Sequence, residues 1–260
     1  MNIKKPLKNI LRPIYRHYLS FSHRGDKLTC NICGKKFKDL RPINSIHADG
    51  KIFQPENRVG SCWFCNSYPR MREVWYWLEH EYKIKEKKSL KILHVAPEIP
   101  ISQKLRKLKG IDYICVDKHC EGYEYPKYVA DGDVTKLNFK NEEFDLVICN
   151  HVLEHVKEDN KAIKELYRVC KPGGFSILLV PIDLSLKNTK EEPDGVILGP
   201  EEREKRFGQY DHVRLYGLDY FDRLEKEGFA IERKIYDSNI ITKFGLEPEE
   251  ELVVCRKSDP

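Results

Sequence analysis

Nearly continuous apolar segments alternate with segments of helical periodicity between residues 90 and 182. The apolar segments are LKILHVA (90–96), DYICVD (112–117), YVAD (128–131), FDLVICN (144–150) and GFSILLVPI (174–182). They are rich in β-branched residues, which is typical of strands buried on both faces of a parallel sheet. Helical spacing is found between them in SQKLRKLKG and EDNKAIKELYRVC. The alternation predicts a doubly wound, Rossmann-like α/β domain.

The chain after this region predicts one further helix and two further strands. The helix is expected near 218–228, and the strands near 229–237 and 250–257. Residues 183–216 are polar, rich in Pro, Gly and Glu, and without a strong period. A connection of this length in a compact domain is usually a lid or binding loop, so we predict a substrate lid here. The α/β domain is predicted to span 89–260.

The N-terminal segment 1–29 is basic and amphipathic. Its apolar residues between positions 7 and 19 recur at helical spacing, with Lys8, Arg12 and Arg16 on another face. Seven basic residues and one acidic residue give the segment a formal charge of +6, whereas the whole chain has +5. We expect the apolar stripe to pack on the body of the protein, and the alternative is peripheral contact with a membrane or a partner.

The bulk composition is that of a soluble globular protein. The 260 residues are 33% charged and 40% hydrophobic, enough for one α/β domain with a small appendage. The segment that precedes residue 20 is interrupted by arginines and has no small-residue cleavage site, so we expect a reducing, cytoplasmic setting. Nine cysteines, an odd number, agree with that setting. The sequence predicts no oligomeric state.

Two CxxC pairs predict a metal site between residues 30 and 85. Four thiolates complete the shell of a closed, structural Zn²⁺ site of the zinc-ribbon type, and the helical stretch MREVWYWLEHEY follows the second pair. Gly34 and Asn66, one after each pair, tolerate the left-handed backbone that such turns need. The alternatives are a redox pair, unrelated thiols, or His47 in place of one cysteine. The predicted ligands are Cys30, Cys33, Cys62 and Cys65.

The ends of the predicted parallel strands are the expected ligand crevice. Ligands of open parallel sheets bind beyond the carboxyl ends of the strands. Ala96 and Glu98 follow the first strand, and Asp117, 21 residues after Ala96, ends the second and is placed to accept ribose hydroxyls. The third and fourth strands are followed by Asp131, Asp133, Asn150 and His151.

Residues 90–182 resemble the class I S-adenosylmethionine-dependent methyltransferases of the type 11 group. ILHVAPE stands in place of the glycine-rich first motif, ICVD supplies the ribose acid, and DGDVTKLNF resembles the adenine-contacting segment. FDLVICNHVLEHV and LYRVCKPGGFSILLVP match the fourth strand, the next helix and the fifth strand. Because Pro97 has no amide hydrogen, the carboxylate of the cofactor needs donors from another segment. The implied cofactor-binding residues are Ala96, Glu98, Asp117, Asp133, Val134, Asn150 and His151.

A narrower resemblance covers almost the whole chain. Uncharacterised bacterial proteins combine a CxxC…CxxC head with LHxAPE, CNHVLEHV and FGQxDHVRxYG, which residues 207–217 match here. Within the last motif we expect His212 to be a general base or to position the acceptor. Asp211 would orient it or act as the base, and Arg214 would anchor an anionic acceptor. The alternative is a loop held by a salt bridge.

The resemblance implies an enzyme of the EC 2.1.1 type that transfers a methyl group to a small-molecule, saccharide or peptide acceptor. One alternative is a ribosomal or transfer RNA methyltransferase that grips RNA with the zinc head, which would bind more weakly in salt. Another is a non-catalytic adaptor that binds zinc and a nucleoside. The letters HxxEH at 151–155 are also those of a zinc protease, but His151 directly follows a buried strand, before a full helical turn.

Overall fold

A seven-stranded mixed sheet forms the centre of the protein. The computed structural model describes residues 4–53, 58–248 and 251–259. The strand order is β12-β13-β9-β8-β5-β6-β7. Its strands are β5 (Leu90–Val95), β6 (Ile111–Asp117), β7 (Val129–Asp131), β8 (Phe144–Asn150), β9 (Cys170–Leu179), β12 (Phe229–Lys234) and β13 (Leu252–Lys257). The prediction of a doubly wound α/β fold is confirmed.

The five strands from β7 to β9 are parallel; β13 pairs with β9 antiparallel, and β12 pairs with β13 antiparallel. Chain order reverses between β5 and β8, because β6 lies on one side of β5 and β8 on the other. Open α/β sheets bind ligands where the strand order reverses in this way. The crevice is therefore expected beyond Val95 and Asn150.

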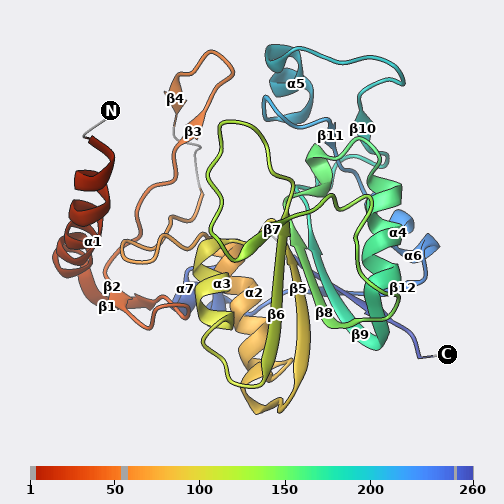
Figure 1. The fold of residues 1–260 in the computed structure, drawn as a ribbon. Coiled ribbons are helices and arrows are strands. Elements are labelled where there is room, and N and C mark those ends of the chain that lie inside the picture. The colour runs from red at the N-terminus through yellow and green to blue at the C-terminus, as the bar shows by residue number, and fades with distance from the viewer. Residues whose placement is uncertain (1–3, 54–57, 249–250, 260) are drawn as a thin grey trace.

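Helices cover both sides of the sheet (Figure 1). They are α2 (Pro69–His80), α3 (Ile99–Leu105), α4 (Asp159–Val169) and α6 (Asp219–Lys226). In Figure 1, α2 and α3 lie on one side, and α4 and α6 on the other. The α4 helix shows why: Ala162, Ile163, Leu166 and Val169 are fully buried on one face, at the spacing of an amphipathic helix.

The N-terminal region is built of small elements that pack on the α/β domain. They are α1 (Lys4–Ser22), β1 (Arg24–Thr29), β2 (Lys36–Phe37), β3 (Ser45–Ile46) and β4 (Ile52–Phe53), with a 3-10 turn at Ile84–Glu86 after α2. We call residues 30–85 the head. Phe37 and Trp75 of the head are fully buried in the same apolar core as the strands of the sheet. The two predicted domains are thus joined through continuous packing.

The α1 helix presents its apolar stripe to solvent, contrary to our expectation that it packs on the body. Leu11, Ile14 and Tyr18 are 52%, 62% and 64% exposed. The opposite face rests on the head, where Ser20 is buried and the ring of His17 meets Phe64 edge to face at 5.0 Å. The side chains of residues 7–10 lie outside the part of the chain that the structure describes.

The segment 183–216 contains more regular structure than its weak period predicts. It holds β10 (Lys190–Glu191), α5 (Pro200–Phe207) and β11 (Arg214–Leu215), and β10 pairs with β11. Local signals delimit α5, since Pro200 occupies its first turn and Gly208 ends it at a φ of +82°. We call residues 183–216 the lid. A second short helix, α7 (Ser238–Phe244), was also not expected; Asp237 caps it by accepting hydrogen bonds from the amides of Asn239 and Ile240.

Within residues 4–53, 58–248 and 251–259, no helix is both long enough and apolar enough to cross a bilayer.

Replacing a core residue of β8 should cost stability. Ile148 is fully buried between β5 and β9. Ile148→Ala should lower the free energy of unfolding by about 2–5 kcal/mol, because it removes apolar surface and leaves a cavity. Urea unfolding followed by circular dichroism measures the loss. Ile235→Ala, at a side chain that is 69% exposed, is the control and should change stability little. Equal losses in both variants would contradict the assigned core.

Candidate functional site

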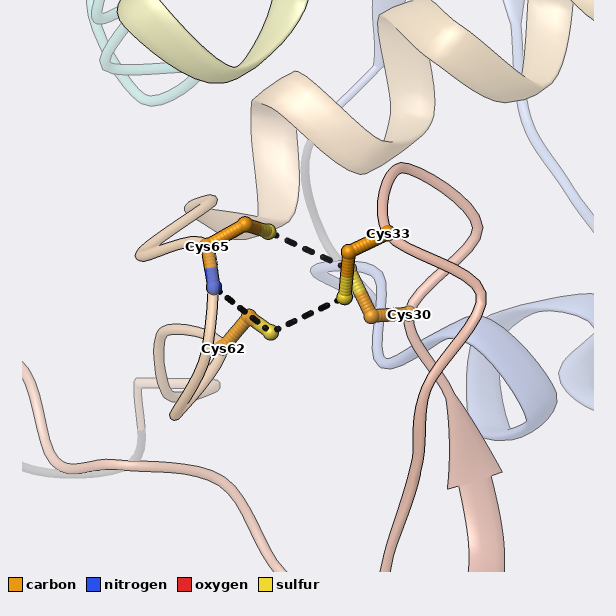
Figure 2. Close-up of side chains that lie close together, drawn as sticks. All are labelled: Cys30, Cys33, Cys62 and Cys65. Atoms are coloured by element: carbon orange, nitrogen blue, oxygen red, sulfur yellow. Dashed lines mark hydrogen bonds between the residues drawn. The ribbon is translucent and has the colours of Figure 1, made fainter. Parts of the chain in front are cut away.

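Four cysteine thiols from the two CxxC pairs face one another (Figure 2). Their sulfurs lie within 4.8 Å of one another, with Cys30 Sγ 3.6 Å from Cys65 Sγ and Cys33 Sγ 3.7 Å from Cys62 Sγ. A tetrahedral zinc ion with Zn–S bonds of about 2.3 Å separates its sulfurs by about 3.8 Å. The four thiols therefore fit a closed tetrahedral site.

The backbone of both loops has the shape that the sequence predicts. Gly34 and Asn66 have φ values of +75° and +60°. Each ends a turn in which its amide donates to the carbonyl of the first cysteine of its pair. The Ser67 hydroxyl lies 3.3 Å from both Cys30 Sγ and Cys65 Sγ, where it can donate to a thiolate. The loops are thus formed to hold sulfur ligands.

Glu98 lies at the centre of the crevice between β5 and β8. Its Oε2 accepts from His94 Nε2 at 3.2 Å and from Asn150 Nδ2 at 3.4 Å. Burial alone would raise the pKa of Glu98, but the bond from His94 and nearby positive charge hold it below its ordinary value. Glu98 Oε1 and Asn150 Oδ1 are buried and have no hydrogen-bond partner among the described residues. Because both oxygens accept hydrogen bonds, a ligand with donor groups would satisfy them.

Arg70 is a candidate residue that our sequence interpretation missed. It lies in the first turn of α2, and its Nε is 3.6 Å from Glu98 Oε1. This Nε is buried without a hydrogen-bond partner in the described chain. A guanidinium here offers the donors that Pro97 cannot. The signal in the sequence is the helix start YPRMRE directly after the second CxxC pair, but no spacing rule links it to a strand end 28 residues later.

The first turn of the crevice uses alanine where a glycine would be expected. Ala96 has a φ of +46°, and its amide donates to the carbonyl of Val116 at 2.8 Å. Left-handed backbone is unfavourable for residues with a side chain, and alanine has the smallest one. The glycine-poor motif therefore still forms the turn between β5 and α3.

Asp117, Asp133 and Val134 lie at the same edge of the sheet, on the β6 and β7 side. Asp117 is half-buried, and burial raises its pKa. Asp133 accepts from Lys118 Nζ at 2.8 Å and from the amide and hydroxyl of Thr135, which lowers its pKa to about 2. Val134 is buried. Together with Glu98, these residues therefore lie along the carboxyl ends of the strands β5, β6 and β7.

A pocket of about 1050 Å³ opens beside this crevice. Its walls come from four parts of the chain: the head, the ends of β8 and β9, the lid, and the C-terminal part, which contributes Phe221 and Val253. Arg70 and His151 face it from the crevice side, and Ile43 to Ile46 from the head. The lid closes over it through Phe207 to Tyr210 and His212. The head, which carries the four cysteines, therefore also forms one wall of the pocket.

The lid is attached to the head above this pocket. Glu204 of α5 accepts from His47 Nδ1 at 2.5 Å and from the amide of Ala48 at 2.8 Å. In Figure 1 the β3–β4 hairpin and α5 lie at the same end of the molecule, beyond the sheet. His47, which we considered as an alternative to one cysteine ligand, therefore has a different partner.

The residues predicted to be catalytic are placed differently from one another. His212 is 7% exposed and lines the pocket, with its ring 4.8 Å from that of His155, centroid to centroid. Among the described residues, the carboxylate of Asp211 makes no hydrogen bond with the imidazole of His212. It lies instead 3.5 Å from His155 Nδ1. His151, which we placed with the cofactor, has a φ of +52° and lies 3.2 Å from Glu154. Glu154, His155 and His212 thus form one cluster.

Arg214 is 3% exposed and its guanidinium is engaged by the protein itself. It donates to the carbonyls of Leu153, Val156 and Lys157 and lies 3.5 Å from Asp159 Oδ2. These bonds attach the lid to the 3-10 turn Leu153–His155. The structure therefore gives Arg214 the role of holding the His212 loop, and we do not retain it as an anchor for an acceptor.

Comparison with known proteins agrees with the resemblance stated above. Residues 102–178 match the type 11 family described as "Methyltransferase domain". A segment of 47 residues is 51% identical to demethylmenaquinone methyltransferase of Streptomyces avermitilis, covering 18% of this chain and 20% of that protein. A segment of 114 residues is 29% identical to norajmaline N-methyltransferase of Rauvolfia serpentina, covering 43% and 37%.

The chain spans between about a fifth and two fifths of the length of these two relatives. Among solved structures, an S-adenosylmethionine-dependent methyltransferase from Mesorhizobium loti has a TM-score of 0.45 and 14% identity, over 66% of this chain and 93% of that one. The family match over residues 102–178 runs from α3 to β9 and so lies within the seven-stranded sheet and its helices.

Proposed function

We propose that the protein transfers the methyl group of S-adenosylmethionine to a small-molecule, saccharide or peptide acceptor bound in the pocket between head, sheet and lid. The observation that carries the proposal is the continuity of the two sites. Arg70 and His151 border both the crevice around Glu98 and the pocket of about 1050 Å³. A cofactor in the crevice would thus direct its methyl group into a half-open pocket of about the size that ligand pockets have.

The crevice groups match the parts of this cofactor. Asp117 would accept the ribose hydroxyls, and Asp133 and Val134 would contact the adenine. The carboxylate of the methionine part would bind Arg70, and its ammonium group would donate to Glu98 and Asn150. The buried atoms without partners, Arg70 Nε, Glu98 Oε1 and Asn150 Oδ1, support this assignment, because such atoms are costly unless a ligand completes them. Ala96 and His151 would border the cofactor at the two turns.

The chemistry that the cofactor supplies is an in-line displacement at its methyl carbon. The main contribution of the protein is to align an acceptor atom with that carbon and to exclude water. The lid, held by Glu204 and Arg214, encloses the acceptor. His212 is the candidate base, and Asp211 orients His155 beside it. The RNA and adaptor alternatives gain no support from an observation on the described residues.

We further propose that the four cysteines hold one structural Zn²⁺. The support is the sulfur geometry and the donors around it, together with the buried Arg72, whose positive charge interacts with the thiolates. A four-thiolate site has no open position, so its role would be to hold the head in shape. The loop of the second pair leads directly into α2 and Arg70.

Calorimetry with S-adenosylmethionine tests the proposed enzyme. The wild type should release or absorb heat on binding. Asp117→Ala and Arg70→Ala should each weaken binding by about 10- to 100-fold, since each removes hydrogen bonds that involve a charged group. The matched control is Asp112→Ala at the opposite, exposed end of β6. No binding by the wild type, or equal binding by all four proteins, would refute the cofactor assignment.

Metal analysis tests the zinc proposal. After brief treatment with a weak chelator, one zinc ion should remain per wild-type chain, because a closed thiolate site releases zinc slowly. Cys30→Ser should lose this ion and unfold at a lower temperature, since structural zinc contributes directly to folding. Cys120→Ser changes an exposed cysteine and should keep the ion. An unchanged zinc content in Cys30→Ser would contradict the four-cysteine ligand set.

A further inference from the structure

A second cluster of metal-ligand side chains lies in the wall of the pocket, apart from the cysteines. Glu154, His155 and His212 each offer one ligand atom, and these atoms lie within 4.8 Å of one another. The 3-10 turn Leu153–His155 provides two of the residues and the lid provides the third. All three line the pocket of about 1050 Å³. The sequence brings Glu154 and His155 together, but only the fold adds His212.

Glu154 is a buried carboxylate without hydrogen-bond donors. Its side chain is 1% exposed, and neither oxygen has a hydrogen-bond partner among the described residues. His151 Nδ1 is 3.2 Å from Oε1 but lies outside hydrogen-bonding geometry. A buried carboxylate without hydrogen-bond donors is costly to remove from water, and a bound cation would offset that cost.

Both imidazoles are oriented by their other nitrogen. His212 Nδ1 lies 3.3 Å from the carbonyl of Phe207, and His155 Nδ1 lies 3.2 Å from the carbonyl of Asp211. A carbonyl only accepts, so each Nδ1 donates to it, and in the neutral ring Nε2 then has the lone pair that a metal ion would bind. Histidine ligands of zinc are typically fixed in this way, with the second nitrogen bonded to a carbonyl or carboxylate. Asp211 adds its carboxylate at 3.5 Å from His155.

We propose that Glu154, His155 and His212 bind one divalent transition-metal ion of the zinc type. Two imidazole nitrogens and one carboxylate oxygen are a ligand set that zinc takes in catalytic sites, where a fourth position stays open. Small side-chain rotations would bring the ligand atoms to the separation of about 3.4 Å that tetrahedral bonds of about 2.1 Å require. The open position faces the pocket. This site differs from the cysteine site, which is closed.

The use of the ion rests on the proposed methyltransferase function, whereas metal binding itself does not. With His212 bound to the ion, the ion takes over the role of the base proposed above: a hydroxyl group of the acceptor would bind at the open position, where the ion lowers the pKa of the hydroxyl and its proton passes to water. An oxygen lone pair then forms a bond to the methyl carbon of S-adenosylmethionine. The C–S bond breaks and its electron pair stays on sulfur, which leaves S-adenosylhomocysteine. The inference thus favours acceptors that react through oxygen.

Cobalt titration of the full-length protein tests the metal site. Protein treated briefly with a weak chelator keeps its cysteine-bound zinc and should take up one Co²⁺ per chain. The spectrum should show weak visible bands without the strong ultraviolet charge-transfer band of thiolate ligands. Glu154→Gln, of nearly the same shape, and His212→Ala should lose this uptake. Asp211→Asn should weaken it by about 10-fold or more through the orientation of His155.

The controls separate this inference from the cofactor assignment. His80→Ala removes an exposed histidine at the end of α2 and should keep full uptake. Asp117→Ala should also keep it, because the titration needs no S-adenosylmethionine. Acetohydroxamate, an oxygen chelator, should shift the cobalt bands of the wild type if one position is open. If the folded wild type takes up no Co²⁺, or if Glu154→Gln and His212→Ala take up as much as the wild type, the metal site is refuted. The two histidines of the cluster would then act only as candidate bases.

An independent observation concerns α1, whose exposed stripe is unpartnered in the described structure. Leu11, Ile14, Tyr15, Tyr18 and Phe21 are 52%, 62%, 59%, 64% and 76% exposed. They recur every three or four residues and so share one face. The helix sequence contains Lys4, Lys5, Lys8, Arg12 and Arg16 and no acidic residue. In Figure 1, α1 lies at the edge of the molecule, away from the sheet.

We infer that α1 lies on the surface of an anionic lipid membrane. A helix with one apolar, aromatic face and several basic residues is suited to the interface of such a bilayer. Apolar burial alone would fit a protein partner equally well. The sequence of the helix, with five basic residues and no acidic one, favours the negatively charged surface.

Co-sedimentation with lipid vesicles tests this second inference. The wild type should bind vesicles that contain phosphatidylglycerol and bind vesicles of phosphatidylcholine several-fold less. The double variant Ile14→Ser, Tyr18→Ser should lose most of this binding. Ile235→Ser, at a side chain that is 69% exposed elsewhere, should not. Equal binding to the two kinds of vesicle would overturn the membrane assignment. A dimer of the wild type that the double variant disrupts would overturn it as well.

Discussion

The shape of the pocket depends on one buried guanidinium, that of Arg72. The residue is fully buried in α2 and donates to backbone carbonyls of Gly60 and Ser67, on either side of the second CxxC pair, and to those of Phe244 and Gly245 at the end of α7. A buried charge is costly unless its donors are satisfied, and here carbonyls from three chain segments satisfy them. Burial lowers the pKa of Arg72, and the nearby thiolates act in the opposite direction. The same bonds fix the head against the C-terminal part of the domain.

The fixed head explains how a glycine-poor first motif fits the crevice. Arg70 lies two residues before Arg72 and reaches Glu98. The turn at Ala96 supplies the backbone path, and α2 supplies the charge that the turn lacks. The four thiols, the start of α2 and the crevice are therefore connected through Arg70 and Arg72. Arg70 reaches Glu98 although Glu98 follows 28 positions later in the chain.

The sequence predicted those features that have a local cause. The strands from β5 to β9 are apolar runs that must be buried, and the left-handed turns at Gly34 and Asn66 follow from the residue types. The short helices α5 and α7 escaped prediction because their period is weak, although Gly208 and Asp237 mark their ends. The burial of Arg214 was missed, because it depends on carbonyls some sixty residues away. The exposed stripe of α1 has the same pattern as a buried one, so periodicity alone did not separate the two.

The letters HxxEH at residues 151–155 illustrate the limit of motifs. A protease would need His151 and His155 one helical turn apart, but His151 has left-handed backbone and precedes a 3-10 turn. Glu154 and His155 instead meet His212, which follows 57 residues later in the chain. The chemistry of this region therefore belongs to the assembly of turn and lid, which no contiguous pattern encodes.

The contact of Glu204 with His47 and Ala48 has a consequence for turnover. A lid attached only at its own base could open without disturbing the rest of the molecule. Because this lid also contacts the hairpin of the head, an opening motion of the lid would break the two hydrogen bonds of Glu204. The residence time of the product would then depend on how firmly the head holds its hairpin. In an enzyme of the proposed kind, the cysteine site would then influence the rate of product release through this contact, although it is remote from the reacting atoms.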